Sequence, residues 1–264
     1  MQRTLKADWL TNYLASSSCW VGGRPLQDKK SDFGEVLRTI RYFRGHEQTF
    51  TTVVVLEFSH DSRNSPQESL FELALQDIHL PANFVLGVWR NDLNDFSIYK
   101  EGKYEMKVSS NRVLQTFAEF DSSIVGNSKN LKPINRSFTD SFHIWARNNM
   151  KGFQNDVDAY AVVDTRVHIM ELKRPTESIE SWRPYMADAW NYINLGDYSK
   201  FCSGEMTTIA YNESTPGKIK ILKDIEIQRG RFMRYKQGFM SFTPAENILT
   251  KMKDVDFSIE ISNR

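Results

Sequence analysis

The segment from Asp156 to Pro175, DVDAYAVVDTRVHIMELKRP, places the strongest limit on how this chain can fold. Two runs rich in β-branched residues flank the dipeptide Asp164-Thr165, which predicts a β-hairpin over residues 157–173. Side chains along a strand point alternately to the two faces of a sheet, so Glu171 and Lys173 share one face. The sequence therefore predicts an acid and a base side by side at the end of the second strand.

The length of the turn decides which residues of the first strand lie opposite this acid and base. With a two-residue turn, continuing the pairing outward sets Asp158 opposite Glu171. The same register sets Asp156 opposite Lys173. Opposed side chains on one face bring their Cβ atoms to about 4.5–5.5 Å, and two carboxylates at that spacing are unfavourable unless a hard divalent ion lies between them. A three-residue turn would move Asp158 to the other face.

This hairpin resembles the core of the PD-(D/E)xK nuclease superfamily, which includes restriction-endonuclease-like enzymes. The resemblance covers residues 138–211 and rests on Asp158 as the acid of the first strand and on Glu171-Leu172-Lys173 as the acid-x-lysine of the second. It implies an α/β fold in which a mixed β-sheet is flanked by helices, with a restriction-endonuclease-like core in the C-terminal half. It also implies Mg²⁺ as the cofactor, with Mn²⁺ as a substitute.

The resemblance further implies metal-assisted hydrolysis of phosphodiester bonds. Asp158, Glu171 and the backbone carbonyl of Leu172 are the expected metal ligands, and Lys173 is expected to orient the attacking water. DNA is favoured over RNA as the nucleic-acid partner, because most of the superfamily acts on DNA. The alternatives are an RNA-cleaving nuclease, a nucleic-acid-binding protein with this fold and no turnover, and an interaction module whose hairpin charges are merely solvated.

Two features depart from the family pattern. Val157 stands where the family name has Pro, and no Gln opens a Gln-xxx-Tyr pattern in the following helix, although Asp188 and Tyr192 hold that spacing. Family members usually add an acid from an upstream helix. Glu35 is the preferred candidate for that acid, and Asp140 and Glu119 are the alternatives.

Other residues offer rival chemistry. The triplet Glu105-Met106-Lys107 also lies in a predicted hairpin, whose turn is Glu101-Gly102. That turn leaves the upstream acid Asp95 on the other face, so the alternation of the strand disfavours this triplet. If no metal takes part, His143 and His168 are the alternative acid and base.

Basic and aromatic residues alternate between Gln228 and Phe242, QRGRFMRYKQGFMSF. Such interleaving suits a polynucleotide, whose phosphates attract basic side chains and whose bases stack on aromatic rings. A solvated strand with one packed face explains the pattern equally well. The predicted nucleic-acid-binding residues, including the arginine that follows the hairpin, are Arg174, Arg229, Arg231, Arg234 and Lys236.

Hydrophobic periodicity and turn residues predict the remaining elements. Helices are expected at 33–43, 67–78, 111–120, 140–148 and 181–195, the last closed by Gly196. Strands are expected at 52–58, 83–89, 96–99, 103–108, 206–211, 218–222 and 255–261. Because strands and helices interleave, the predicted fold class is α/β with a mixed sheet.

The 264 residues are enough for one large domain or two small ones. The stretch 121–137, rich in Ser, Asn, Lys and Pro, is the boundary candidate. We therefore expect an N-terminal α/β region over 1–130, serving substrate recognition or dimerisation, and a nuclease core over 131–264, unless the two form one continuous domain. This organisation allows a homodimer.

Charge and cysteine content exclude few functions. The 34 Lys and Arg residues against 33 Asp and Glu give a net charge of +1, which is compatible with a polyanionic partner because the local field matters more than the total. Cys19 and Cys202 lack partners at metal-ligand spacing, which argues against a zinc site and a disulfide framework and suits the reducing cytoplasm. No stretch approaches the length of a membrane span, so no membrane partner is expected.

Overall fold

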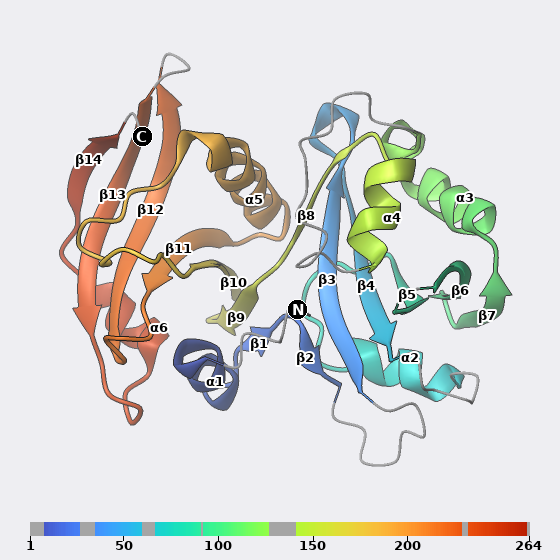
Figure 1. Cartoon of the computed structure of the whole chain (residues 1–264), viewed down its shortest axis with the longest axis horizontal. Coiled ribbons are helices and arrows are strands. Elements are labelled where there is room, and N and C mark those ends of the chain that lie inside the picture. The colour runs from blue at the N-terminus through green and yellow to red at the C-terminus, as the bar shows by residue number, and fades with distance from the viewer. Residues whose placement is uncertain are drawn as a thin grey trace. The chain divides into compact units, whose positions relative to one another are not determined.

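The computed structural model describes residues 8–26, 35–59, 67–90, 92–126, 141–228 and 232–262. The chain forms two compact units, each built on its own β-sheet (Figure 1). Unit 1 contains Gly22–Asp156, and unit 2 contains Ala7–Val21 together with Val157–Arg264. Unit 2 therefore joins a short N-terminal segment to the whole C-terminal part of the chain.

The sheet of unit 2 has the strand order β1-β9-β10-β11-β12-β13-β14. The β10–β11 pair is parallel and its other described pairs are antiparallel, so the sheet is mixed. The strands are β1 (Trp20–Val21), β9 (Ala159–Val163), β10 (Arg166–Lys173), β11 (Glu205–Tyr211), β12 (Lys218–Gln228), β13 (Phe232–Ser241) and β14 (Ser258–Ser262).

Helices cover both faces of this sheet. On one face, α1 (Trp9–Ser16) and α6 (Ile248–Lys251) pack on a cluster that includes Leu172 and Ile209. On the other face, α5 (Ala189–Phe201) contributes Tyr192 to a cluster with Ala210, Leu222 and Tyr235. Short 3-10 turns precede α5 (η4, Met186–Asp188) and follow α6 (η5, Met252–Asp254). Because a parallel strand pair needs a crossover connection, α5 is what allows β11 to lie beside β10.

The sheet of unit 1 has the order β2-β3-β4-β5-β6-β7, and β8 also pairs with β3. Helices α3 and α4 pack on one face, and Phe71 of α2 meets the ring of Phe58 on the other. The strands are β2 (Arg24–Pro25), β3 (Val36–Arg44), β4 (Phe50–Phe58), β5 (Phe84–Trp89), β6 (Asp92–Lys100), β7 (Lys103–Val108) and β8 (Phe153–Asp156). The helices are α2 (Glu68–Leu75), α3 (Ser110–Asp121) and α4 (Ser141–Asn149), with 3-10 turns η1 (His46–Gln48) and η2 (Ser122–Ile124).

Most of the predicted elements are confirmed, and so is the α/β class with mixed sheets flanked by helices. The predicted hairpin over 157–173 is β9 and β10, and the predicted turn at Glu101-Gly102 joins β6 to β7. The other strands that the sequence predicts correspond to β4, β5, β11, β12 and β14. The confirmed helices are α2, α3 and α4.

The helix predicted at 33–43 is wrong, because its described part is strand β3. The spacing of Val36, Ile40 and Phe43 fits a helix, but β3 is buried on both faces and so lacks the polar and apolar alternation of a half-exposed strand. Pairing with β4 along its full length, from Val36 opposite Phe58 to Arg44 opposite Phe50, stabilises the extended form.

The helix predicted at 181–195 is displaced toward the C-terminus. Helix α5 begins at Ala189, because Pro184 interrupts the preceding segment, and it continues through Gly196 to Phe201. Gly196 therefore lies inside the helix and does not end it. Cys202 holds the C-cap position and donates its backbone N–H to the carbonyl oxygens of Lys200 and Tyr198.

The division of the chain differs from the expected one at residue 130. The expected boundary lies outside the described residues, and the two units instead change at residues 21–22 and 156–157. The N-terminal segment belongs to unit 2 because β1 pairs with β9, where Trp20 stacks on Tyr160 at 5.4 Å between ring centroids. In the described parts of the chain, no helix is long and apolar enough to cross a membrane.

Candidate active site

The β9–β10 hairpin has the two-residue turn that the sequence predicts. Val163 pairs with Arg166, and the register continues outward to Ala159 opposite Met170. Asp164 and Thr165 have φ values of 50° and 68°, and two positive φ angles in succession define the turn type that matches the twist of paired strands. The next positions outward on the two strands are those of Asp158 and Glu171.

Asp158 lies directly before β9 and is held against the backbone of β10. Its Oδ2 accepts a hydrogen bond from the backbone N–H of Leu172 at 2.8 Å. Leu172 stands between Glu171 and Lys173 in sequence, so this bond places the Asp158 carboxylate beside the acid-x-lysine triplet. The three site residues of the sequence prediction thus come together at one end of the hairpin.

Glu171 and Lys173 form a close ion pair. Lys173 Nζ lies 2.8 Å from Glu171 Oε1, and only 7% of Glu171 is exposed. The parallel neighbours of these residues on β11 are Thr208 and Ala210. Because β10 is bordered by β9 on one side and β11 on the other, the strand that carries the pair is fixed inside the sheet.

Helix α5 and its N-cap residue each add one side chain to this pair. Asp188 Oδ2 lies 3.9 Å from Lys173 Nζ, and the ring centroid of Tyr192 lies 5.5 Å from the same nitrogen. Burial alone would lower the pKa of Lys173. The charge and hydrogen bond of Glu171, together with Tyr192 and Asp188, outweigh burial and raise the pKa of Lys173 well above its usual value, so the side chain is an ammonium.

The predicted position of Asp156 opposite Lys173 is wrong. Asp156 ends β8 and pairs with Arg41 of β3 in unit 1. The chain leaves the hairpin at Val157, because the edge of β3 provides a partner for residues 153–156. Asp156 therefore does not extend the pairing of β9 with β10.

The upstream acids chosen from the sequence are engaged in unit 1 or lie outside the described residues. Glu35 directly precedes strand β3, so it does not lie on the predicted helix. Its Oε2 lies 3.9 Å from Arg90 Nη2. Glu119 of α3 pairs with Lys100 at 2.5 Å and with Arg112 at 3.1 Å. Asp140 lies outside the described residues.

The structure instead brings Asp8 into unit 2 beside the site. Asp8 is 6% exposed, caps α1 through the backbone N–H of Thr11 at 2.9 Å, and accepts a hydrogen bond from the hydroxyl of Tyr211. Burial raises the pKa of Tyr211, and Asp8 and Asp158 raise it further, so the two acids act on one phenol. The sequence signal for Asp8 was its N-cap position before the apolar run WLTNYL.

Arg174 follows the hairpin and points toward this group. Its Nη1 lies 3.9 Å from Asp8 Oδ2 and 3.6 Å from Glu213 Oε1, with 48% of its side chain exposed. Among the predicted nucleic-acid-binding residues that the structure describes, Arg174 lies beside the candidate site.

The oxygen donors at the site fit a Mg²⁺ ion that keeps part of its water shell. Within the described ranges, no group of three or more His, Cys, Asp and Glu side chains is arranged to hold a metal. Mg²⁺ in proteins commonly takes only one or two carboxylates and completes its coordination with water and substrate oxygens, which matches Asp158 and Glu171. The buried Thr208 Oγ1 and Tyr192 hydroxyl have no hydrogen-bond partner among the described residues, so polar capacity beside Glu171 and Lys173 is unused.

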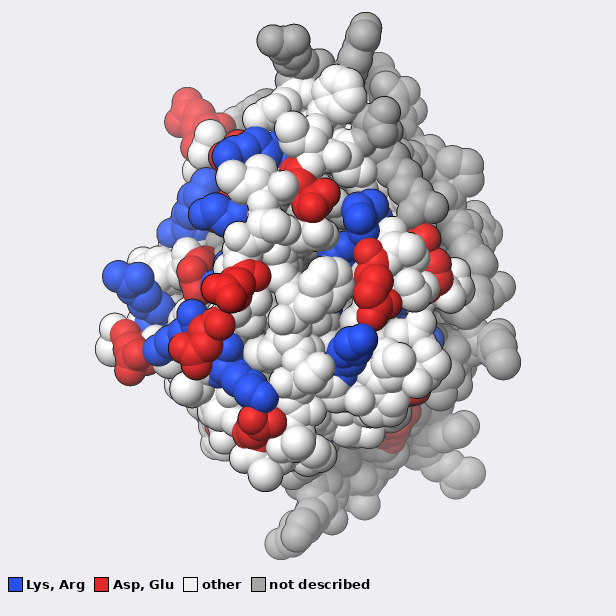
Figure 2. All heavy atoms as spheres, turned by 90° about the vertical axis from the view of Figure 1, so that its left-hand side faces the viewer, with Lys and Arg blue, Asp and Glu red and all other residues white. Residues whose placement is uncertain are grey.

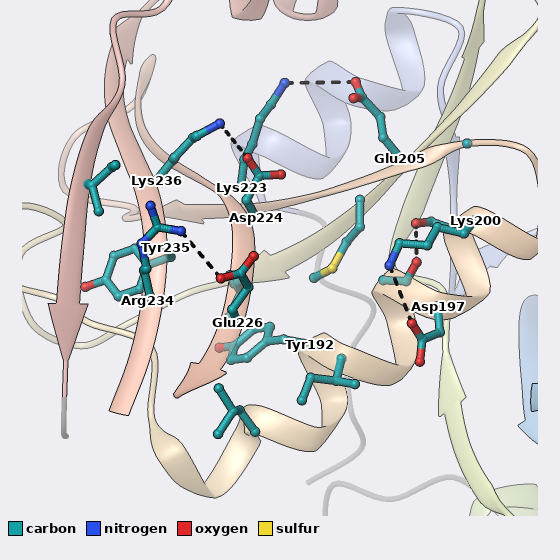
Figure 3. Close-up of a pocket in the computed structure, with 18 residues that line it drawn as sticks. Tyr192, Asp197, Lys200, Glu205, Lys223, Asp224, Glu226, Arg234, Tyr235 and Lys236 are labelled. Atoms are coloured by element: carbon teal, nitrogen blue, oxygen red, sulfur yellow. Dashed lines mark hydrogen bonds and ion pairs between the residues drawn. The ribbon is translucent and has the colours of Figure 1, made fainter. Parts of the chain in front are cut away.

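A groove of about 690 Å³ lies between α5 and the strands β11, β12 and β13 (Figure 3). Tyr192 lines it and also contacts Lys173, so the groove adjoins the candidate site. Its apolar lining is formed by Ile193, Met206, Ile225, Ile227 and Ile259.

Ion pairs cross the rim of this groove. They join Arg234 to Glu226 at 3.5 Å, Lys236 to Asp224 at 2.7 Å and Lys223 to Glu205 at 3.9 Å. On the side of the molecule where β13 and β14 lie, Lys and Arg alternate with Asp and Glu among the described residues (Figure 2). The predicted basic residues Arg234 and Lys236 are thus each paired with an acid, and Arg229 and Arg231 lie outside the described residues.

The rival residues occupy other surroundings. His168 Nδ1 lies 2.8 Å from Glu205 Oε1, at the other end of β10 from Lys173. His143 belongs to α4 in unit 1, where its Nδ1 lies 3.4 Å from Arg41 Nη1. Glu105 is bound by Arg112, at 2.5 and 2.8 Å.

Comparison with known proteins adds no family to this description: the sequence matches no protein-family model and no curated protein. The geometry of the site therefore carries the functional argument.

Proposed function

We propose that this protein is a Mg²⁺-dependent nuclease that hydrolyses phosphodiester bonds, with DNA as the favoured substrate. The observation that carries the proposal is the convergence of Asp158, Glu171 and Lys173, tied together by the Leu172 N–H to Asp158 bond and the Glu171–Lys173 ion pair. This convergence agrees with the first-strand acid and the acid-x-lysine of the superfamily that the hairpin resembles. A restriction-endonuclease-like core for unit 2 is part of the same proposal.

Each residue has a role that its position supports. Asp158, Glu171 and the carbonyl of Leu172 would hold Mg²⁺, which when bound lowers the pKa of a water molecule and offsets phosphate charge. Lys173 can donate a hydrogen bond to the attacking water and stabilise the negative charge that develops on the phosphoryl oxygens. Asp8 and Tyr211 hold the start of α1 and the end of β11 beside Asp158.

The groove beside Tyr192 is the proposed path for the nucleic acid away from the site. The rim pairs of Arg234 and Lys236 are half-exposed, and ion pairs of that kind contribute about 1 kcal/mol or less. Phosphate groups can therefore replace the carboxylates. If the path is correct, the double variant Arg234→Glu, Lys236→Glu will bind DNA more weakly and with a shallower dependence on salt concentration, because fewer counterions are released.

A nucleic-acid-binding protein without turnover is the second candidate function. The ion pair between Lys173 and Glu171 Oε1 favours this second function. A metal ion would have to compete with the Lys173 ammonium for that carboxylate. Cleavage and binding must therefore be measured separately.

The test is incubation of the protein with supercoiled, linear and single-stranded DNA, and with RNA, in the presence and absence of MgCl₂ or MnCl₂. We expect metal-dependent cleavage that falls by about 10²-fold or more in Glu171→Gln and in Lys173→Ala, since each removes a group that acts on the transition state. Lys218→Ala is the matched control, because Lys218 is half-exposed on the same sheet and pairs with Glu180. Near wild-type cleavage by Lys173→Ala, or cleavage that survives EDTA, would contradict the proposed function. Binding without cleavage would favour the second candidate.

A further inference from the structure

Among the described residues, the ammonium of Lys173 lies within 4 Å of two carboxylates, which differ in burial. Glu171 Oε1 lies 2.8 Å from its ammonium, whereas Asp188 Oδ2 lies 3.9 Å away. The side chain of Glu171 is 9% exposed and that of Asp188 is 36% exposed. The Lys173 ammonium therefore forms its closer ion pair with the buried Glu171, and the more exposed Asp188 lies slightly farther away.

Asp188 does not perform the usual task of an acid in its position. It occupies the N-cap of α5, where Asp normally accepts a hydrogen bond from a backbone N–H of the first turn. Its side chain makes no such capping bond within the described part of α5. Asp8, Ser109 and Asn247 do cap their helices, so a capping geometry is readily formed in this protein. The carboxylate of Asp188 is directed to Lys173 instead.

Tyr192, one helical turn after Asp188, keeps the ammonium near both acids. Its ring lies 5.5 Å from Lys173 Nζ and only 2% of the residue is exposed. The face of an aromatic ring attracts a cation. The Tyr192 ring therefore stabilises the Lys173 ammonium in this position beside α5. Asp188 and Tyr192 thus come from one helix and act on one lysine.

The ion pair between Lys173 and Glu171 conflicts with the proposed role of Glu171 as a cation ligand. A divalent cation bound to Glu171 would be repelled by an ammonium on the same carboxylate. The ammonium needs a second partner that is close and still attached to the site. We propose that Asp188 is a positioning residue that receives Lys173 when Glu171 takes up a divalent cation. This inference rests on the proposed function only in treating Glu171 as a cation ligand.

The exchange has two consequences. With Asp188 present, Lys173 leaves Glu171 without leaving the site, so cation binding is favoured and the ammonium stays available to the substrate. Without Asp188, Lys173 competes with the cation for Glu171. Asp188 should therefore influence cation affinity through Lys173, which distinguishes it from a direct ligand.

The test is a double-mutant cycle on the full chain, measured by isothermal titration calorimetry with MnCl₂ and no nucleic acid. We expect Asp188→Asn to weaken Mn²⁺ binding about tenfold, a typical size for coupled sites. Lys173→Gln should bind Mn²⁺ more tightly than the wild type, because the competing ammonium is gone. In the Lys173→Gln background, Asp188→Asn should weaken binding by no more than about threefold, since only the general effect of one lost charge remains.

Three further variants separate positioning from helix stability. Asp188→Glu keeps the charge and should retain most of the affinity. Asp188→Ser keeps a good N-cap residue without the charge and should behave like Asp188→Asn. Asp197→Asn makes the same chemical change later in α5, where Asp197 pairs with the exposed Lys200 at 3.7 Å, and should leave Mn²⁺ affinity unchanged.

The outcomes distinguish this inference from the nuclease proposal. Equal weakening by Asp188→Asn in both backgrounds, or wild-type affinity in Asp188→Ser, would overturn the positioning role while leaving cleavage by the wild type to stand. If the predicted coupling is found and no nucleic acid is cleaved, the positioning role stands and the nuclease proposal fails. Failure of the wild-type protein to bind Mn²⁺ would overturn the inference.

Discussion

Replacement of Lys220 by Met should change how the stability of the protein depends on pH. Lys220 lies on β12 with 0% exposure, and its Nζ donates a hydrogen bond to the carbonyl oxygen of Trp182 at 2.7 Å. The same nitrogen lies 5.4 Å from the ring of Phe239. Burial, and to a smaller extent the charge of Arg183, lower the pKa of Lys220 from 10.5 to about 8.

The direction of the effect follows from proton binding. Between pH 8 and pH 10.5 the unfolded chain holds the proton of Lys220 more strongly than the folded protein does, so the free energy of unfolding rises with pH across that window. Below pH 8 both states are protonated and the folded state carries a constant penalty. The fall in the pKa of Lys220 from 10.5 to about 8 corresponds to about 3 kcal/mol over the whole window.

The measurement is urea unfolding, followed by tryptophan fluorescence, of the wild type and of Lys220→Met from pH 7 to pH 10.5. Methionine fills similar volume without a charge, but it leaves the Trp182 carbonyl without this donor, at a cost of about 1 to 3 kcal/mol. The two proteins should therefore be close in stability at pH 7, and the wild type should become the more stable one as pH rises. Taking the difference between them removes the titration of all other groups.

Lys218→Met is the control on the same strand. Lys218 is 47% exposed and pairs with Glu180 at 3.0 Å, so its difference from the wild type should change little with pH. If the difference in the free energy of unfolding between the wild type and Lys220→Met does not change from pH 7 to pH 10.5, the lowered pKa of Lys220 is refuted.

Three other outcomes are expected. Ca²⁺ should support a stable complex with uncleaved DNA in a gel-shift assay, because it accepts oxygen ligands with loose geometry at about 2.3–2.6 Å, whereas Mg²⁺ demands near-octahedral coordination at about 2.0–2.1 Å. In-line attack needs the water, the phosphate and Lys173 placed closely, and a misplacement of about 1 Å can cost about 10²-fold in rate; Ca²⁺-supported cleavage at the Mg²⁺ rate would contradict the site. Gly196→Ala should raise the free energy of unfolding by about 0.5–1 kcal/mol, since an added Cβ meets no atom within 4 Å and the residue lies inside α5. A loss of stability would contradict the position of Gly196 inside the helix. Thr165→Gly should stabilise the protein by about 1 kcal/mol in the same assay, because φ is 68° at a β-branched residue; an unchanged midpoint would mean that the turn is unstrained.

The sequence alone predicted the hairpin because every interaction that defines it is local. Alternating side chains and a two-residue turn fix the pairing of Val163 with Arg166, and the register then carries Asp158 toward Glu171. The acid-x-lysine spacing puts Glu171 and Lys173 on one face of any strand. The core of the candidate site was therefore present in a single stretch of chain.

Local pattern failed where a partner strand decided the outcome. The spacing of Val36, Ile40 and Phe43 is compatible with a helix and with a strand buried on both faces. The pairing of β3 with its partner strands distinguishes the two, and the partners β4 and β8 lie on later segments. Asp156 was misplaced for the same reason, since the pairing of β8 with β3 competes with extension of the hairpin.

The surroundings of the site were decided by tertiary structure. Asp188 reaches Lys173 because the parallel pairing of β10 with β11 requires a crossover, and α5, which has Asp188 at its N-cap, lies over the sheet within that crossover. Asp8 reaches Tyr211 because β1 pairs with β9 and draws the N-terminal helix into unit 2. The sequence thus determined which chemical groups the hairpin presents. Contacts between distant segments determined the counter-ions of those groups, because such contacts depend on sheet pairing that cannot be read from a local pattern.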